Sequence, residues 1–192
     1  CGTALILAQP AFAQSAAPFQ MLSSDLQKYA NGAPVPGPFQ VNATDVQAAT
    51  NFSSGATASG TLTQNTGETV IFTGTGSAGN AVVINNDGGA TRFYDNSTAA
   101  SANITNNGTL QFSNTASGGQ AQIVTNGGAV TVFTDSAVAG AAGATLTNNG
   151  TTIFLDQSGT GGSAGAHNKT RELHLAGDST TGGGFDKSGV AG

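Results

Sequence analysis

Three aspartates recur at one position of a repeating pattern, and they are the first residues to test for chemistry. Asp95, Asp135 and Asp156 each lie two residues after a phenylalanine, and Asn114 holds that place in the intervening copy. Stacked carboxylates could supply oxygen ligands to Ca²⁺. The same residue types also end strands by accepting backbone hydrogen bonds in Asx turns. Because the turns lack the glycine-rich calcium repeat, the pattern favours Asx turns and predicts no metal site.

The remaining reactive side chains do not form a recognisable catalytic pattern. His167 and His174 are seven residues apart, which is not the helical spacing of a two-histidine metal site. No serine lies in a Gly-x-Ser-x-Gly context, and no phosphate-binding Gly-Lys-Ser/Thr motif occurs. The five Lys and Arg residues are scattered along the chain. We therefore predict no catalytic residue, no cofactor site and no enzymatic activity.

The composition excludes several classes of protein. Gly, Thr, Asn and Ser make up 87 of the 192 residues, and only 8% are charged, against about 25% in ordinary soluble domains. The net charge of −5 argues against a nucleic-acid partner. A single cysteine excludes a disulfide-stapled domain. Such a polar chain is either rich in β-structure or disordered.

Periodicity favours β-structure over disorder. Four segments share one plan, which is an alternating apolar run, an Asn-rich turn, a second alternating run and a phenylalanine. The recurring phenylalanines are separated by 21, 19, 21 and 21 residues, and a further step of 21 reaches Leu175. A fixed period of this length is typical of solenoids. The predicted ladder residues are Phe72, Phe93, Phe112, Phe133 and Phe154, with Asn86, Asn107, Asn126 and Asn149 at the turns.

We therefore predict an all-β fold, a right-handed parallel β-helix with about 21 residues per rung. Each short strand would pair with the equivalent strand one rung later, and the phenylalanines would stack inside. A second interior column would contain Ile84, Ile104, Ile123 and Leu146. The glycines expected to supply positive φ angles at the turns are Gly88, Gly108, Gly127 and Gly150.

The chain outside the repeats predicts an exported protein. The apolar run Ala4–Ala8 followed by Ala11-Phe12-Ala13 resembles the end of a secretory signal peptide, with cleavage after Ala13. A short buried strand, or lipidation at Cys1, are the alternatives for this segment. The predicted organisation is a signal remnant over 1–13, a linker or N-terminal cap over 14–59, β-helix repeats over 60–178 and a truncated Gly-rich tail over 179–192.

The repeats over about 60–160 resemble the passenger repeats of bacterial autotransporter-like proteins, the type V secretion passengers of Gram-negative bacteria. The resemblance lies in runs such as ITNNGTLQFSNTASGG, from Ile104 to Gly119. It implies export through the periplasm and outer membrane, display at or release from the cell surface, and a C-terminal outer-membrane barrel in the full-length protein. The chain shows no run of barrel strands before its last residue, Gly192.

The function expected from these observations is a structural or adhesive β-helical stalk without a catalytic site. Host-cell, bacterial-cell or glycan surfaces would be its partners. The first alternative is a fragment of a β-helical polysaccharide lyase or hydrolase, which needs paired or clustered acids. The second alternative is a face that binds ice or mineral through threonine columns, for which Thr109, Thr131 and Thr151 are the candidates.

Overall fold

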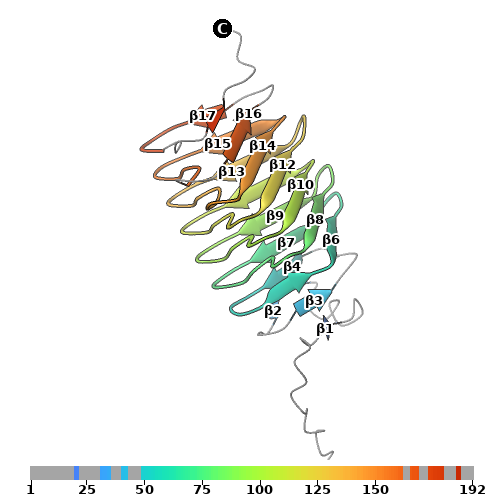
Figure 1. Ribbon diagram of the computed structural model, residues 1–192. Helices are drawn as coiled ribbons and strands as arrows, with labels where there is room; N and C mark the ends of the chain where they lie inside the picture. Colours follow the sequence, from blue (N-terminus) through green and yellow to red (C-terminus); the bar gives the residue numbers. More distant parts are fainter. Residues whose placement is uncertain are drawn as a thin grey trace, which may run out of the picture.

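The computed structural model is a β-solenoid whose coils stack along one axis (Figure 1). It describes residues 20–21, 31–35, 40–42, 49–161, 165–168, 173–179 and 185–186, with side chains over 50–161 and 173–179. The described elements are all strands, and every pair between them is parallel. The stacked phenylalanines of neighbouring coils are 19 to 21 residues apart in sequence. The prediction of a parallel all-β solenoid is therefore confirmed.

One side of the solenoid is an eight-stranded sheet, which we name the Phe sheet after its inward-facing phenylalanines. Its strands from the N-terminal end are β2 (Asn31–Val35), β4 (Ala49–Phe52), β7 (Thr69–Phe72), β9 (Ala90–Phe93), β11 (Thr109–Phe112), β13 (Val130–Phe133), β15 (Thr151–Phe154) and β17 (Leu173–Leu175).

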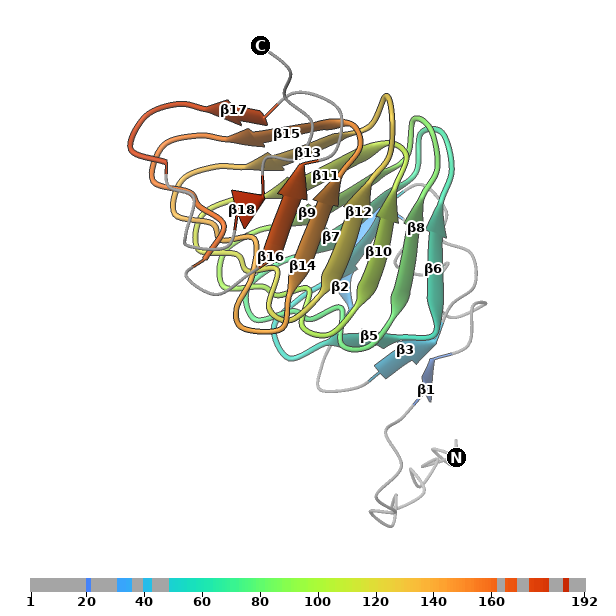
Figure 2. The ribbon, with the colours of Figure 1, turned by 45° about the horizontal axis from the view of Figure 1, so that its top comes forward.

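A seven-stranded sheet forms the second side, and we name it the Asn sheet after the asparagines that follow its strands. Its strands are β6 (Thr61–Gln64), β8 (Val82–Asn85), β10 (Asn103–Asn106), β12 (Gln122–Thr125), β14 (Thr145–Asn148), β16 (Gly165–Asn168) and β18 (Phe185–Asp186). Figure 2 shows this sheet in front. Each strand pairs with the equivalent strand of the next coil. Neighbouring strands in both sheets are therefore never consecutive in sequence.

The third side is narrower. It begins with a three-stranded sheet of β1 (Gln20–Met21), β3 (Gln40–Asn42) and β5 (Thr57–Ser59). Single parallel bridges then continue the column from Thr57 through Ser77, Thr98, Ser117 and Val138 to Gly159. Small buried side chains, mostly alanine, line this wall from the inside, and Ala58, Ala78 and Ala99 are examples. Small side chains are needed here because the aromatic stack and the inward side chains of the Asn sheet fill the rest of the interior.

Six phenylalanine rings stack in one continuous column. The five predicted rings lie in it, and Phe52 of β4 adds a sixth below Phe72. Neighbouring ring centroids are 4.6–4.8 Å apart, and each ring is fully buried. The spacing follows the strand separation of a parallel sheet. Since β4 belongs to this stack, the solenoid starts before Gly60, the boundary predicted from the repeats. Leu175 pairs with Phe154 as predicted, but it is 47% exposed.

The second apolar column differs from the prediction at one residue. It contains Leu62, Val83, Ile104, Ile123 and Leu146, which are in register and buried. Ile84 was expected in this column, but it pairs with Thr105 and lies half-buried on the outside. The error has a simple cause, because Val82, Val83 and Ile84 are all apolar and do not reveal which of them faces inward.

A buried polar column lies beside the apolar one. The last residue of each strand from β6 to β14 faces inward, in the series Gln64, Asn85, Asn106, Thr125 and Asn148. These side chains bond across the interior to the Phe sheet. Asn85 Oδ1 accepts from Thr91 Oγ1 at 2.8 Å, and Asn106 Nδ2 donates to the Val130 carbonyl at 2.9 Å. The network satisfies most of these buried groups and ties the two sheets together, although Gln64 Nε2 has no partner.

The turns from the Asn sheet to the Phe sheet have two lengths. Four residues connect β8 to β9 and β12 to β13, whereas two connect β10 to β11 and β14 to β15. Gly88 has the predicted positive φ of 73°, but Gly108, Gly127 and Gly150 do not. Gly108 and Gly150 instead allow close approach, since a β-carbon at Gly108 would lie 2.3 Å from the Gly89 carbonyl oxygen.

Candidate functional site

A ladder of Asx side chains follows the Phe sheet along one corner of the solenoid. We name it the Asx ladder, and its members are Asp95, Asn114, Asp135 and Asp156. One side-chain oxygen of each residue accepts a hydrogen bond from the backbone N–H of the equivalent residue one coil earlier. Gly74 donates to Asp95 Oδ2 at 3.1 Å, and Asn114 donates to Asp135 Oδ2 at 2.9 Å. The corresponding bonds to Asn114 Oδ1 and to Asp156 Oδ2 measure 3.2 and 3.3 Å.

The backbone at these residues explains why Asp and Asn recur there. All four have φ between 57° and 60°, in the left-handed region. Asp and Asn tolerate this conformation better than other residues with a β-carbon. Glycine takes the same place at both ends of the ladder, with φ of 58° at Gly74 and 68° at Gly177. The left-handed conformation therefore explains the residue types, whereas their side-chain bonds run to the previous coil and are not the local bonds of an Asx turn.

Replacing Asp135 by alanine should destabilise the solenoid by about 2 kcal/mol, because it removes an acceptor and places alanine at positive φ. Asp135→Asn keeps the acceptor and the conformational tolerance, so its effect on stability should be within about 0.5 kcal/mol. Urea unfolding followed by circular dichroism measures both. Equal losses for the two variants would show that the carboxylate charge, rather than the turn geometry, matters at this position.

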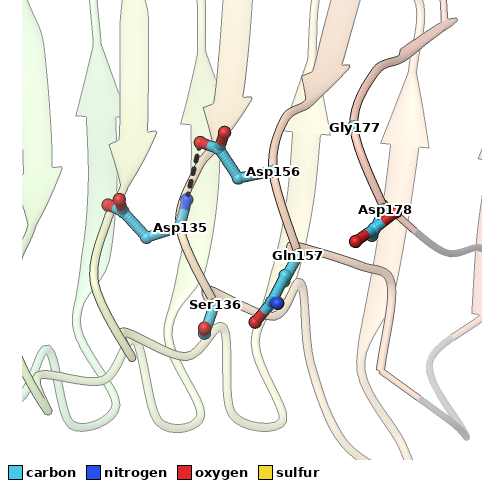
Figure 3. Close-up of a pocket in the computed structure, with 6 residues that line it drawn as sticks. All are labelled: Asp135, Ser136, Asp156, Gln157, Gly177 and Asp178. Carbon is cyan, nitrogen blue, oxygen red and sulfur yellow. Dashed lines mark hydrogen bonds between the residues drawn. The ribbon is translucent and has the colours of Figure 1, made fainter.

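The C-terminal part of the Asx ladder borders an open hollow of about 420 Å³. Its lining residues are Asp135, Ser136, Asp156, Gln157, Gly177 and Asp178. Figure 3 shows carboxylates from successive coils along this surface, with Asp156 turned toward the backbone nitrogen of Asp135. Gly177, which takes the place of Asp156 one coil later, contributes no side chain to this lining. Its polar groups are carboxylate, hydroxyl and carboxamide oxygens that face solvent.

This arrangement offers hydrogen-bond acceptors but little else for catalysis. Within the part of the chain that the structure describes, no group of three or more His, Cys, Asp or Glu residues is arranged to hold a metal ion. Arg92 is the only described cationic Lys or Arg residue, and it lies in β9, on the Phe sheet. The two histidines lie in different sheets, with His167 in β16 and His174 in β17. The structure therefore aligns the aspartates on successive coils and places the two histidines in different sheets.

The predicted turn asparagines form a second ladder on the outer surface. Each follows directly on a strand of the Asn sheet, and the structure adds Asn65 to the N-terminal end of the series. Asn86 Nδ2 donates to Asn65 Oδ1 at 2.9 Å, and Asn126 Nδ2 donates to Asn107 Oδ1 at 2.7 Å. Asn149 occupies the equivalent place after β14. These carboxamides link neighbouring coils at a corner and carry no charge.

The outer face of the Asn sheet from β6 to β14 carries no charged side chain, whereas the outer face of the Phe sheet includes Arg92. The first and third residue of each strand point outward, while the second and fourth are buried. The outward residues form two columns without a charged side chain. They are Thr61, Val82, Asn103, Gln122 and Thr145 in one column, and Thr63, Ile84, Thr105, Val124 and Thr147 in the other.

Sequence reasoning missed this face and proposed a different set of threonines. Thr109 and Thr151 point outward from the Phe sheet, but Thr131 is buried and faces the interior. Thr131 pairs with Leu110 and Thr152, so the three predicted threonines do not form one column. The sequence signal that could have indicated this face is the pair of Thr-x-Thr sequences at 61–63 and 145–147. Each lies in the strand that precedes a ladder phenylalanine's strand.

Comparisons with known proteins leave the chain without an assigned family. No protein-family description matches it, no curated protein matches it, and no solved structure matches it. The described residues also contain no helix with the length and apolar character needed to cross a membrane. Function therefore has to be argued from the surfaces of the solenoid itself.

Proposed function

We propose that the chain is a structural and adhesive segment of an exported protein, displayed at or released from a bacterial surface like the autotransporter passengers that its repeats resemble. The observation that carries the proposal is the uncharged outer face of the Asn sheet. It is supported from inside by fully buried columns, so its hydroxyl, amide and aliphatic groups are held in a fixed array. Such a face can make many weak contacts at once, and their sum gives avidity without a deep pocket.

The interior supports a role as a stalk. The rings repeat every 4.6–4.8 Å along the axis, and the backbone bonds between coils continue through both long sheets. Repeat structures of this kind are stabilised by contacts between neighbouring coils, so their length can grow without a larger core. Export as an unfolded chain followed by folding at the surface suits a chain with a single cysteine, because no disulfide within the chain has to form. The partners that we propose are host-cell, bacterial-cell or glycan surfaces.

The test places the chain on the surface of a non-adherent Gram-negative strain through an unrelated outer-membrane anchor. Adhesion to epithelial cells, to glycan-coated plates and to other bacteria is then compared with the anchor alone. The test variant carries Thr63→Glu, Thr105→Glu and Thr147→Glu, which lie in one outward column of the Asn sheet. We expect its adhesion to fall by about tenfold or more, because each buried charge at a contact needs a partner.

A matched control carries the same three changes on the other sheet. Thr69, Thr109 and Thr151 form an outward column of the Phe sheet with the same two-coil spacing. We expect this control to adhere like the parent chain at equal surface density. Equal losses in the two variants would contradict the assignment of the Asn sheet as the adhesive face. Absence of adhesion by the parent chain to every surface would overturn the proposed function.

An enzymatic function is the second candidate, and the hollow at Asp135, Asp156 and Asp178 is the observation that favours it. Carboxylates on neighbouring coils could act as an acid and base pair on a polysaccharide. The test is release of reducing or unsaturated ends from acidic and neutral glycans by the purified chain. Activity that disappears in Asp156→Asn would favour this candidate, and no release from any glycan would remove it.

A further inference from the structure

We propose that Asn126 is a site of spontaneous deamidation, and that the fold protects Asn107 and Asn149 from the same reaction. Each of the three asparagines precedes a glycine in the turn that follows an Asn-sheet strand. Asn-Gly pairs are the most reactive in this chemistry, because glycine has no side chain to hinder its backbone nitrogen. The three sites therefore share the same reactive Asn-Gly pair and differ in their surroundings. This inference does not depend on the proposed function.

The reaction needs a free backbone nitrogen on the glycine. That nitrogen loses its proton to water or hydroxide and attacks Cγ of the preceding asparagine. A bond forms between this nitrogen and Cγ, and the bond from Cγ to Nδ2 of the asparagine breaks. Nδ2 takes up a proton and leaves as ammonia. Water then opens the resulting succinimide to give aspartate or isoaspartate. No oxidant or enzyme is required, so the availability of the glycine N–H decides which pair reacts.

The fold occupies this N–H in two of the three turns. Gly108 N donates to Asn106 Oδ1 at 3.1 Å, and Gly150 N donates to Asn148 Oδ1 at 3.1 Å. Both acceptors belong to the buried polar column, so they are held in place by the interior. Gly150 is itself buried, and Gly108 is half-buried. Attack by either nitrogen requires loss of a hydrogen bond and distortion of a two-residue turn.

The third turn lacks this protection. Thr125 takes the place of the protecting asparagine, and its hydroxyl is hydrogen-bonded to Thr131 Oγ1 at 2.6 Å. Among the described residues, no acceptor for Gly127 N is found. Gly127 is exposed, and the nearest atom to an added β-carbon would be the Asn149 carbonyl oxygen at 3.8 Å. The four-residue turn therefore leaves room for the succinimide ring.

One contact must be broken for Asn126 to react. Its Nδ2 donates to Asn107 Oδ1 at 2.7 Å, and the leaving ammonia takes this donor away. In the product, a carboxylate at position 126 faces the side-chain oxygen Oδ1 of Asn107 and cannot donate a hydrogen bond to it. The modification thus removes one link of the turn ladder and adds a negative charge at that corner of the solenoid.

The first experiment ages the purified full chain at neutral pH and 37 °C and maps its peptides by mass spectrometry. We expect the peptide containing Asn126 to gain aspartate and isoaspartate at least about tenfold faster than the peptides containing Asn107 or Asn149, since those two sites must first lose a hydrogen bond. In strong denaturant the three rates should become similar. Folded-state rates that are equal, or fastest at Asn107 or Asn149, would overturn the proposal.

A variant separates the hydrogen bond from other features of the turn. Asn106→Thr reproduces at the β10 turn the threonine that precedes Asn126, and it removes the acceptor of Gly108 N. We expect deamidation of Asn107 to rise several-fold in this variant, with the rate at Asn149 as the internal control. Circular dichroism checks that the chain stays folded. An unchanged rate at Asn107 in the folded variant would show that the buried asparagine does not protect the site.

Discussion

Replacing Phe112 by alanine should lower the free energy of unfolding by about 3–5 kcal/mol, which is the usual loss for a buried phenylalanine. Phe112 stacks on Phe93 at 4.6 Å and on Phe133 at 4.8 Å, and none of its surface reaches solvent. The change interrupts the aromatic column at its middle, where collapse of the cavity would have to distort the in-register strands on both sides. Chemical unfolding followed by circular dichroism measures the effect.

Two further variants give this prediction its controls. Gln111→Ala changes the neighbouring residue of the same strand, which points outward, and should cost no more than about 0.5 kcal/mol. Phe154→Ala removes a ring that stacks on only one other phenylalanine, because its next neighbour is the half-exposed Leu175. Its loss should be smaller than that of Phe112→Ala. Similar losses at Phe112 and Gln111 would mean that the stack does not hold the solenoid together.

Placing one methyl group at Gly118 should be among the most damaging small changes in the chain. A β-carbon there would lie 1.8 Å from the Ala139 carbonyl oxygen of the next coil, and no flexible side chain is available to move away. Gly118 N also donates to the Val138 carbonyl at 2.9 Å, so the two coils are fixed at this distance. We expect Gly118→Ala to destabilise the protein by about 3 kcal/mol or more, the upper range for overpacking.

Gly127→Ala is the matched control for Gly118→Ala. Gly127 also lies outside the strands and outside the positive φ region, but its nearest neighbour would be 3.8 Å from the added carbon. Its effect on stability should stay within about 0.5 kcal/mol. Thermal melting of the two variants, side by side with the parent, makes the comparison. If both melt at the temperature of the parent, the coils can separate locally at little cost and the contact at Ala139 is not a constraint.

The aromatic column could be predicted from the sequence because phenylalanine has few other places in so polar a chain. A phenylalanine every 19 to 21 residues, with alternating residues before it, defines both the coil length and the inward face of one sheet. Phe52 was not included because the residues just before it, 43–51, contain no Asn- and Gly-rich turn, so that coil looked like part of a cap.

The second sheet was harder to predict, because apolar and polar residues occur on both of its faces. In β8 three apolar residues precede Asn85, and only pairing with β10 shows that Val83 faces inward. The burial of Asn85, Asn106 and Asn148 was not predicted for a related reason. Asn106 lies two residues after Ile104 in the same strand, so both side chains point to the same face. A polar side chain next to a turn nevertheless usually faces solvent. The interior network that reverses this expectation depends on contacts between coils, which no single repeat contains.

In the candidate site, too, the local conformation could be predicted from the sequence, whereas the contacts between coils could not. The left-handed backbone at Asp135 and its neighbours follows from local residue preference, and the sequence analysis placed these residues in Asx turns. The bonds of their side chains to the previous coil, and the hollow above Asp156, depend on stacking. The uncharged face of the Asn sheet likewise emerges only when strands about 20 residues apart are set side by side.

The two turn lengths described above have a consequence for engineering. The coil from Phe93 to Phe112 has a two-residue turn and is 19 residues long, while the coil from Phe133 to Phe154 has the same short turn but a longer segment after Val138. The rings stack equally well in both. The strands thus form a constant frame whose corners accept insertions and deletions independently. The turn Asn126–Ala129, with two exposed glycines, is a natural position for grafting a foreign peptide and displaying it at a chosen height.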